Sequence, residues 1–118
     1  MTYINGFVVP VPDANKDAYI ALAAKAWPLF KEYGALQHVE AWGSQIPDGT
    51  RTDFKRAVAL QDGESVVFSW IAWPDKATAD RCEASMHTDE RWQQMDMSVV
   101  DGKRMIFGGF DTVFAQSR

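Results

Sequence analysis

Two segments of this chain carry the hydrophobic pattern of β-strands. Residues 64–73 are the clearest strand, since apolar side chains occupy both sets of alternating positions and neither face is polar. Residues 3–11 mix β-branched and aromatic residues, and Pro10 and Pro12 close the segment because proline cannot continue a strand ladder. The pattern therefore predicts two strands that are apolar on both sides.

Two further strands are predicted over residues 35–46 and 103–114. The first places alternate side chains on opposite faces of the sheet. The second is broken only by Gly108 and Gly109, and this pair predicts a bulge or a close backbone approach.

Apolar side chains spaced three and four residues apart predict a helix over residues 14–33. Asp13 stands at its N-cap position, and Gly34 follows as a C-terminal cap. Pro28 lies inside the helix, removes one hydrogen bond and crowds the preceding turn. The sequence therefore predicts an interruption with a kink near residues 24–28.

The second half of the chain predicts a helix that starts at Asp75 and a short helical piece at residues 89–95. The helix has an inward stripe formed by Ala79, Cys82 and Met86. The connection over residues 50–63 shows no sustained period, although apolar residues such as Val58 could attach it to the body of the protein.

The resulting order is β-α-β-β-α-β, which predicts a single α+β domain over residues 1–118. This is the ferredoxin-like arrangement, a four-stranded antiparallel sheet with two helices on one face. The other face presents a difficulty, because a half-exposed sheet normally alternates apolar and polar residues. Roughly four large apolar side chains left in water would each forgo about 1.5–3 kcal/mol of burial. We therefore expect a homodimer in which two sheets face each other about a twofold axis.

Composition and charge exclude several classes of protein. The net charge of −4 has the wrong sign for binding to phosphates, so we expect no nucleic-acid partner. No apolar run approaches the roughly 18 residues that span a bilayer, and the first residues lack the layout of a signal peptide. We expect a cytoplasmic protein without a membrane partner. Cys82 is the only cysteine, which excludes an intrachain disulfide.

Candidate chemistry centres on His38 and Glu40, which project with Trp42 to one face of a predicted strand. A histidine beside a carboxylate could act as a base near neutral pH. The alternative is a polar pair at a strand edge or dimer rim. No residues have the spacing of metal ligands, so no metal site is expected.

Arg104 and Arg56 are the candidate cations for a carboxylate or enolate. Each follows an aspartate by three residues, so the alternative is a structural Asp–Arg pair. Tyr3, Asn5, Trp70 and Trp73 would add aromatic walls and a polar contact to a nearby cavity. We thus predict His38, Glu40 and Arg104 as catalytic residues, and a ligand-binding set of Tyr3, Asn5, Trp42, Arg56 and Trp70. Cys82 is interpreted as a core residue because no basic neighbour is identifiable.

Long strings of residues across nearly the whole chain resemble the YbaA-like domain-of-unknown-function family 1428. They are the segments at 3–12, 34–36, 47–49, 52–54, 66–71 and 101–110. The resemblance implies the dimeric α/β barrel superfamily. It supplies no catalytic residues to carry across.

Small proteins of that superfamily often act on planar aromatic or polyketide-like molecules, sometimes without a cofactor. By this analogy the chain is expected to be a cofactor-independent enzyme of that kind. The alternatives are a non-catalytic module that binds a small ligand and an interaction dimer without a ligand. Whether the protein is an enzyme, and which molecule it binds, stay open at the level of the sequence.

Overall fold

A computed structural model describes residues 2–118 and contains one antiparallel sheet with helices. The strands are β1 (Tyr3–Pro12), β2 (Gln37–Trp42), β3 (Glu64–Trp73) and β4 (Ile106–Asp111). The helices are α1 (Lys16–Glu32), α2 (Phe54–Ala57) and α3 (Lys76–Ser85), with short 3₁₀ turns η1 (Asp13–Asn15), η2 (Glu90–Gln94) and η3 (Met97–Val99). The strand order is β2-β3-β1-β4, and the predicted ferredoxin-like fold is confirmed.

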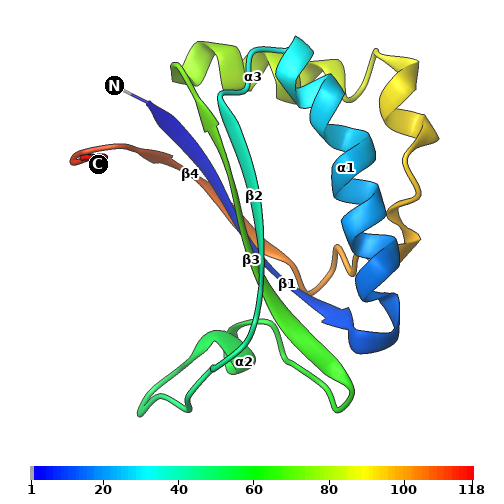
Figure 1. The fold of residues 1–118 in the computed structure, drawn as a ribbon, viewed down its shortest axis with the longest axis vertical. Helices are drawn as coiled ribbons and strands as arrows, with labels where there is room; N and C mark the ends of the chain where they lie inside the picture. Colours follow the sequence, from blue (N-terminus) through cyan, green and yellow to red (C-terminus); the bar gives the residue numbers. More distant parts are fainter. Residues whose placement is uncertain (1) are drawn as a thin grey trace.

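The sheet has two faces with different cover (Figure 1). Helices α1 and α3 and the segment that leads into β4 lie on one side, here called the helix face. The other side, here called the open face, carries α2 at one end only. None of the helices within residues 2–118 is long and apolar enough to cross a membrane.

Strand boundaries differ from the predicted ones mainly at the edges of the sheet. The edge strands β2 and β4 are shorter than the predicted segments 35–46 and 103–114, whereas β3 spans its predicted residues. Edge strands have one neighbour, so pairing with β3 or β1 sets their length rather than the local pattern.

Helix α1 runs unbroken through Pro28, so the predicted interruption was wrong, whereas the kink expected near residues 24–28 stays a prediction. Asp13 is not its N-cap either: the helix follows the η1 turn, and an Asp13 carboxylate oxygen accepts a hydrogen bond from the Ser65 hydroxyl. Gly34 ends the helix as predicted, with a φ of 106° that favours glycine.

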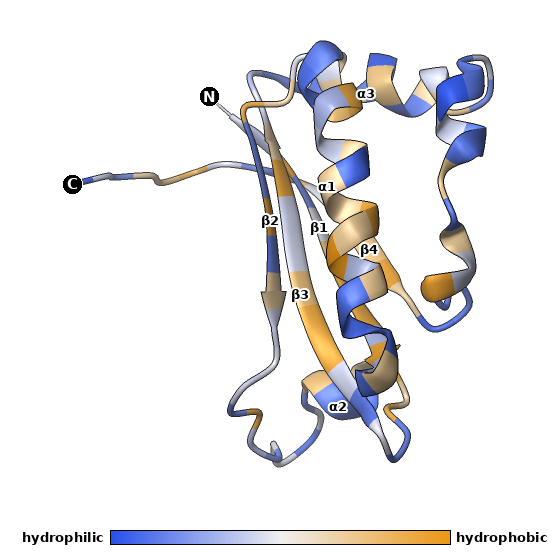
Figure 2. Ribbon diagram, turned by 45° about the vertical axis from the view of Figure 1, so that its right-hand side comes forward, coloured by the Kyte–Doolittle hydropathy of each residue, from blue (hydrophilic) through white to orange (hydrophobic). Residues whose placement is uncertain are grey.

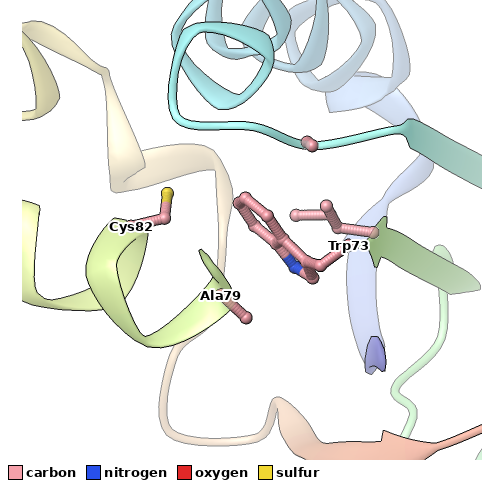
Figure 3. Close-up of a cluster of buried hydrophobic side chains, with 5 residues drawn as sticks. Trp73, Ala79 and Cys82 are labelled. Carbon is pink, nitrogen blue, oxygen red and sulfur yellow. The ribbon is translucent and has the colours of Figure 1, made fainter. Parts of the chain in front are cut away.

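The core on the helix face packs α3 against the sheet. Trp73 is 1% exposed and lies against Ala79 and Cys82 of α3 (Figure 3). The Asp75 side chain caps α3 by accepting a hydrogen bond of 2.8 Å from the Thr78 backbone N–H. Met86, predicted as the end of the inward stripe, is 41% exposed because α3 has already ended at Ser85.

The open face is apolar but only partly covered. Val58, in the connection after α2, is buried against Val8 and Val66, so the expected attachment of this connection is confirmed. Beyond it the sheet is bare, with large side chains in water at Phe68, Ile106 and Phe110. Figure 2 shows hydrophobic residues along β3 as well as on α1.

Candidate functional site

A cavity of about 680 Å³ lies between the helix face of the sheet and the helices above it. Its floor is formed by β1, β2, β3 and β4, and its walls by α1, α3 and the segment of residues 92–105. Most lining side chains are aromatic or aliphatic. The volume falls within the range of roughly 300–1,000 Å³ that is typical of small-molecule sites.

Three polar side chains form a hydrogen-bonded chain at the β2 end of this cavity. The Tyr19 hydroxyl of α1 donates to Glu40 Oε1 at 2.5 Å. His38 Nε2 lies 2.6 Å from Glu40 Oε2. His38 and Glu40 both point to the helix face because they are two residues apart on β2. All three residues line the cavity.

The hydrogen bonds assign a role to each member of this chain. Burial, followed by the charge of Glu40, raises the pKa of Tyr19, so its hydroxyl stays a neutral donor. Glu40 is then the acceptor of both bonds, and whenever the His38 imidazole is neutral its one proton lies on Nε2. Nδ1 of His38 is left with a lone pair. Nδ1 has no hydrogen-bond partner among residues 2–118. Every buried polar side-chain atom of these residues has such a partner, so Nδ1 is not buried and is accessible.

Aromatic rings surround the His38 imidazole. The Phe30 ring meets it edge-on with centroids 5.3 Å apart, and Trp27 lies 6.5 Å away. Phe30 also contacts Trp73 and Trp92, at 6.3 Å and 4.9 Å. The His38 side chain is only 9% exposed. An imidazole held in this way is oriented by its carboxylate partner and shielded from bulk water.

A second polar pair lies on the floor of the cavity. The indole Nε1–H of Trp73 donates to Asn5 Oδ1 at 2.7 Å. Asn5 and Tyr3 are two residues apart on β1, and both line the cavity. Of the eight predicted site residues, the structure therefore brings Tyr3, Asn5, His38 and Glu40 together.

The two arginines lie elsewhere. Arg104 forms a two-pronged ion pair with Glu64 at 2.7 Å and a bond of 2.7 Å to Asp101. The hydrogen bonds from Arg104 lower the pKa of Glu64 and of Asp101. Arg104 does not line the cavity, and its guanidinium is already occupied by carboxylates.

Arg56 likewise binds its own loop, through Asp53 at 2.9 Å and the carbonyl oxygens of Arg51 and Gly49. Both Asp–Arg pairs that the sequence offered as the alternative are thus present. Neither arginine lines the cavity that contains His38. Their charges hold the chain after β2 and the chain before β4 in place.

Two predicted tryptophans also lie outside the cavity lining. Trp42 faces the helix side but packs edge-on against Tyr19, with centroids 6.3 Å apart, beneath Lys16. Trp70 projects from the open face, where its indole N–H reaches Gln37 at 3.3 Å. Strand alternation separates Trp70 from Trp73, which are three residues apart on β3.

Cys82 lines the cavity as a buried thiol whose pKa is raised to about 11 by burial. It is therefore a packing residue, as predicted from the sequence. Within residues 2–118 no three His, Cys, Asp or Glu side chains are grouped so that they could hold a metal ion.

Sequence reasoning missed Tyr19, the third member of the polar chain. Its position in the apolar stripe of α1 indicated a core residue, and it is indeed buried. A buried tyrosine in such a stripe needs a hydrogen-bond partner for its hydroxyl, and Glu40 of strand β2 supplies it. That requirement was the available signal, although it could not identify the partner.

Comparison with known sequences gives consistent results. Residues 2–102 match the family described as protein of unknown function (DUF1428). The chain is 52% identical over 114 residues to uncharacterized protein YbaA of Escherichia coli (strain K12), which covers 96% of this chain and 97% of that protein. Uncharacterized protein YbaA of Shigella flexneri matches with the same identity and coverage.

Solved structures with low sequence identity share the fold. A dimeric ferredoxin-like protein from an uncultured marine organism superposes with a TM-score of 0.64 at 9% identity, covering 98% of this chain and 99% of that one. A Bacillus cereus protein described as a candidate antibiotic biosynthesis monooxygenase gives a TM-score of 0.61 at 8% identity, covering 100% and 97%. At these identities the likeness shows the fold alone.

Proposed function

This chain belongs to the DUF1428 family, and from that premise we propose that it is a cofactor-independent enzyme acting on a small aromatic or polyketide-like molecule. The observation that carries the proposal is the hydrogen-bonded chain of Tyr19, Glu40 and His38 at the wall of a largely apolar cavity. Polar groups are costly in such surroundings unless they are paired, and here each supports the next.

His38 is the proposed base. Its Nδ1 would take a proton from a carbon or oxygen of the substrate, and Glu40 would stabilise the imidazolium that forms. Tyr19 holds the other oxygen of Glu40, which fixes the carboxylate beneath the imidazole. This proton transfer requires only side chains of the protein. A positioned base of this kind typically contributes a rate factor of about 10²–10⁴.

The lining of the cavity supports a flat, aromatic substrate. Rings from Phe7, Phe30, Trp73, Trp92 and Phe107 contribute to the walls. Aromatic rings favour stacked or edge-on contacts with planar molecules. The likeness in fold to the Bacillus cereus protein described as a candidate monooxygenase adds an analogy, which raises oxygenation by molecular oxygen as one fate of a deprotonated substrate.

A second candidate function is the binding of a small ligand without chemistry. The observation that favours it is the set of methionines in the cavity lining, at positions 86, 95, 97 and 105. Methionine is flexible and adapts to ligands of different shape, which suits a binder as well as an enzyme. The two functions differ in whether His38 moves a proton.

The test uses 2-tetralone, a bicyclic aromatic ketone whose benzylic protons next to the carbonyl are acidic. In D₂O under nitrogen, proton NMR follows the replacement of these protons by deuterium. We expect the protein to accelerate the exchange, and His38→Ala to lower the accelerated rate by about 10²–10⁴-fold. Glu40→Gln should lower it less, because the imidazole remains but loses its charged partner.

The matched control is His87→Ala, which removes the other histidine of the chain. His87 is exposed after the end of α3 and does not line the cavity, so this variant should exchange at the wild-type rate. Binding of 2-tetralone without accelerated exchange would favour the ligand-binding function. Equal exchange by the wild type and His38→Ala would overturn the role of His38.

We also propose that the protein is a homodimer joined through the open face. The support is the apolar surface beyond α2, where Phe68 is 45% and Phe110 58% exposed. Phe68 also packs with Phe54 and Trp70, at centroid distances of 6.2 Å and 5.5 Å, so the patch is continuous. Patches of this kind on a soluble protein mark interaction sites. The structural neighbour from the marine organism is described as dimeric, which supports a second copy as the occupant.

A further inference from the structure

Two hydrogen-bond donors of the cavity floor have no use in the proton transfer described above. Trp73 Nε1–H binds Asn5 Oδ1, which fixes the orientation of the Asn5 amide and turns its NH₂ group away from the indole. The Asn5 Nδ2 atom has no hydrogen-bond partner among residues 2–118. Since every buried polar side-chain atom of these residues has a partner, Nδ2 is not buried. It is therefore an accessible donor in a residue that lines the cavity.

The Tyr3 hydroxyl is the second donor, and Gly109 determines where it lies. A Cβ atom added to Gly109 would come within 1.8 Å of the Tyr3 hydroxyl oxygen, so this hydroxyl occupies the space that a side chain at residue 109 would fill. Gly109 is the register partner of Asn5. The Cβ positions of paired residues are roughly 5 Å apart. The Tyr3 hydroxyl therefore lies close enough to donate to the same ligand atom that accepts a hydrogen bond from Asn5.

The register of the sheet places these donors opposite the base. Asn5 of β1 and His38 of β2 are both paired with Ile71 of the central strand β3, one on each side. Neighbouring strands are about 4.8 Å apart, so the two backbones are separated by roughly 10 Å. Ile71 lies between them as a buried apolar floor. A planar molecule lying across Ile71 would meet a base at one end and two donors at the other.

We propose that Asn5 and Tyr3 bind a carbonyl oxygen of the substrate, so that the substrate class is an aromatic ketone with an acidic C–H bond. This inference rests on the proposed function and names its substrate class. When His38 takes the proton, the C–H bond breaks and an N–H bond forms. The electron pair passes through the adjacent C–C bond to the carbonyl oxygen, which becomes an enolate oxygen. The Asn5 N–H and the Tyr3 O–H stabilise that charge.

The first test compares 2-tetralone with tetralin, a hydrocarbon of the same ring frame that lacks the carbonyl oxygen. Isothermal titration calorimetry of the wild-type protein should give 2-tetralone a dissociation constant about tenfold lower than that of tetralin. This factor is counted after correction for the difference in the free energies with which the two compounds transfer from water to an apolar solvent. Asn5→Asp should remove this preference. The aspartate keeps an oxygen for Trp73 Nε1–H but replaces the free donors by an acceptor, so the packing of the floor is retained.

The second test uses a pair of neighbouring glycines. Gly109→Ala should displace the Tyr3 hydroxyl and lower the carbonyl preference about threefold or more, as should Tyr3→Phe. Gly108→Ala is the matched control, since its Cβ would point to the other face and make ordinary contacts of 3.4 Å and 3.5 Å with the Phe110 ring. This control should keep the wild-type preference. Circular dichroism and thermal unfolding check that each variant is folded.

The outcomes separate this inference from the proposed function. Accelerated deuterium exchange with equal affinity for 2-tetralone and tetralin would overturn the carbonyl site and leave His38 as the base. A carbonyl preference that Asn5→Asp abolishes, without any exchange, would overturn the enzyme and keep the site. A wild-type protein that binds neither compound would overturn both.

Discussion

The two faces of the sheet are built from the same strands and are both apolar, yet they differ in where polar groups occur. On the helix face, Asn5, His38 and Glu40 project into a hollow between sheet and helices. On the open face, the register of the described strands assigns two polar side chains, Gln37 at the start of β2 and Glu64 at the start of β3. Polar side chains in fixed positions orient a small molecule, whereas a continuous apolar surface fits a second protein surface.

This difference appears within one strand. Along β3, Val67, Ile71 and Trp73 are buried beneath helices, whereas the intervening Phe68 is 45% exposed. The helix face is therefore closed by its own chain and leaves a cavity, whereas the open face is closed by its own chain only near α2. If the open face is an interface, the effect of a substitution on that face should depend on protein concentration, whereas the effect of a substitution on the helix face should not.

Phe68→Glu should have the largest effect. A twofold axis places each substitution in the interface twice, so the lost burial is about 3–6 kcal/mol, with a further cost for the buried charge. The dimer should then dissociate more than a hundredfold more readily. Light scattering coupled to size-exclusion chromatography should show the wild type at twice 13.3 kDa and the variant at 13.3 kDa.

Glu83→Gln in α3 serves as the control, because this exposed residue belongs to the helix side. It should leave the molecular mass unchanged. A wild-type protein that stays at 13.3 kDa at micromolar concentration, with a folded spectrum, would refute the interface on the open face.

Trp73→Ala should have the next largest effect. Trp73 is 1% exposed, and its truncation should lower the free energy of unfolding by about 3–5 kcal/mol through lost burial and a cavity. Urea unfolding followed by circular dichroism measures this loss. The value should not change with protein concentration, because Trp73 packs only within its own chain, against α3.

Trp70→Ala is the matched comparison on the same strand. Its indole lies on the open face beside Phe68, so its truncation should cost little in dilute protein and progressively more as the concentration rises. Equal losses for the two tryptophans at all concentrations would show that the faces do not differ in the proposed way.

The sequence predicted this contrast of faces better than it predicted the site. Apolar residues on both sides of β3 indicated two covered faces, and the spacing of His38 and Glu40 placed them together because strand geometry is strictly alternating. The lack of side chains at Gly108 and Gly109 predicted a bulge or a close backbone approach, but the group that lies close to Gly109 is the side-chain hydroxyl of Tyr3. The register of β1 with β4 runs without a break, so no bulge is present.

Contacts between elements far apart in the chain could not be predicted from the sequence. Arg104 was a sound candidate for an anion site until the fold brought Glu64 to it from forty residues away. Tyr19 could not be recognised as a site residue, because the helical period reports which side of α1 is buried and not which partner lies there. Tertiary pairing of polar groups depends on the register and packing of several elements, and a single sequence pattern does not contain that information.

The smallest expected effect is a difference in the rate at which a reagent reaches thiols on the two sides of the sheet. Cys82 is the thiol on the helix side. Burial raises the pKa of the thiol to about 11, so at pH 8 only roughly one thiol in a thousand is ionised in the folded protein. Alkylation by iodoacetamide should therefore be much slower than in the urea-unfolded protein, and it should not depend on protein concentration. Mass spectrometry of timed samples gives both rates.

A second thiol introduced by Phe68→Cys extends the measurement to the open face. In dilute protein it should react like an exposed cysteine, because residue 68 is uncovered in a single copy. As the concentration rises, a partner sheet should cover it and slow its reaction, while the rate at Cys82 stays constant. If both thiols respond to concentration alike, association does not select the open face. If neither responds, that face is not covered at all.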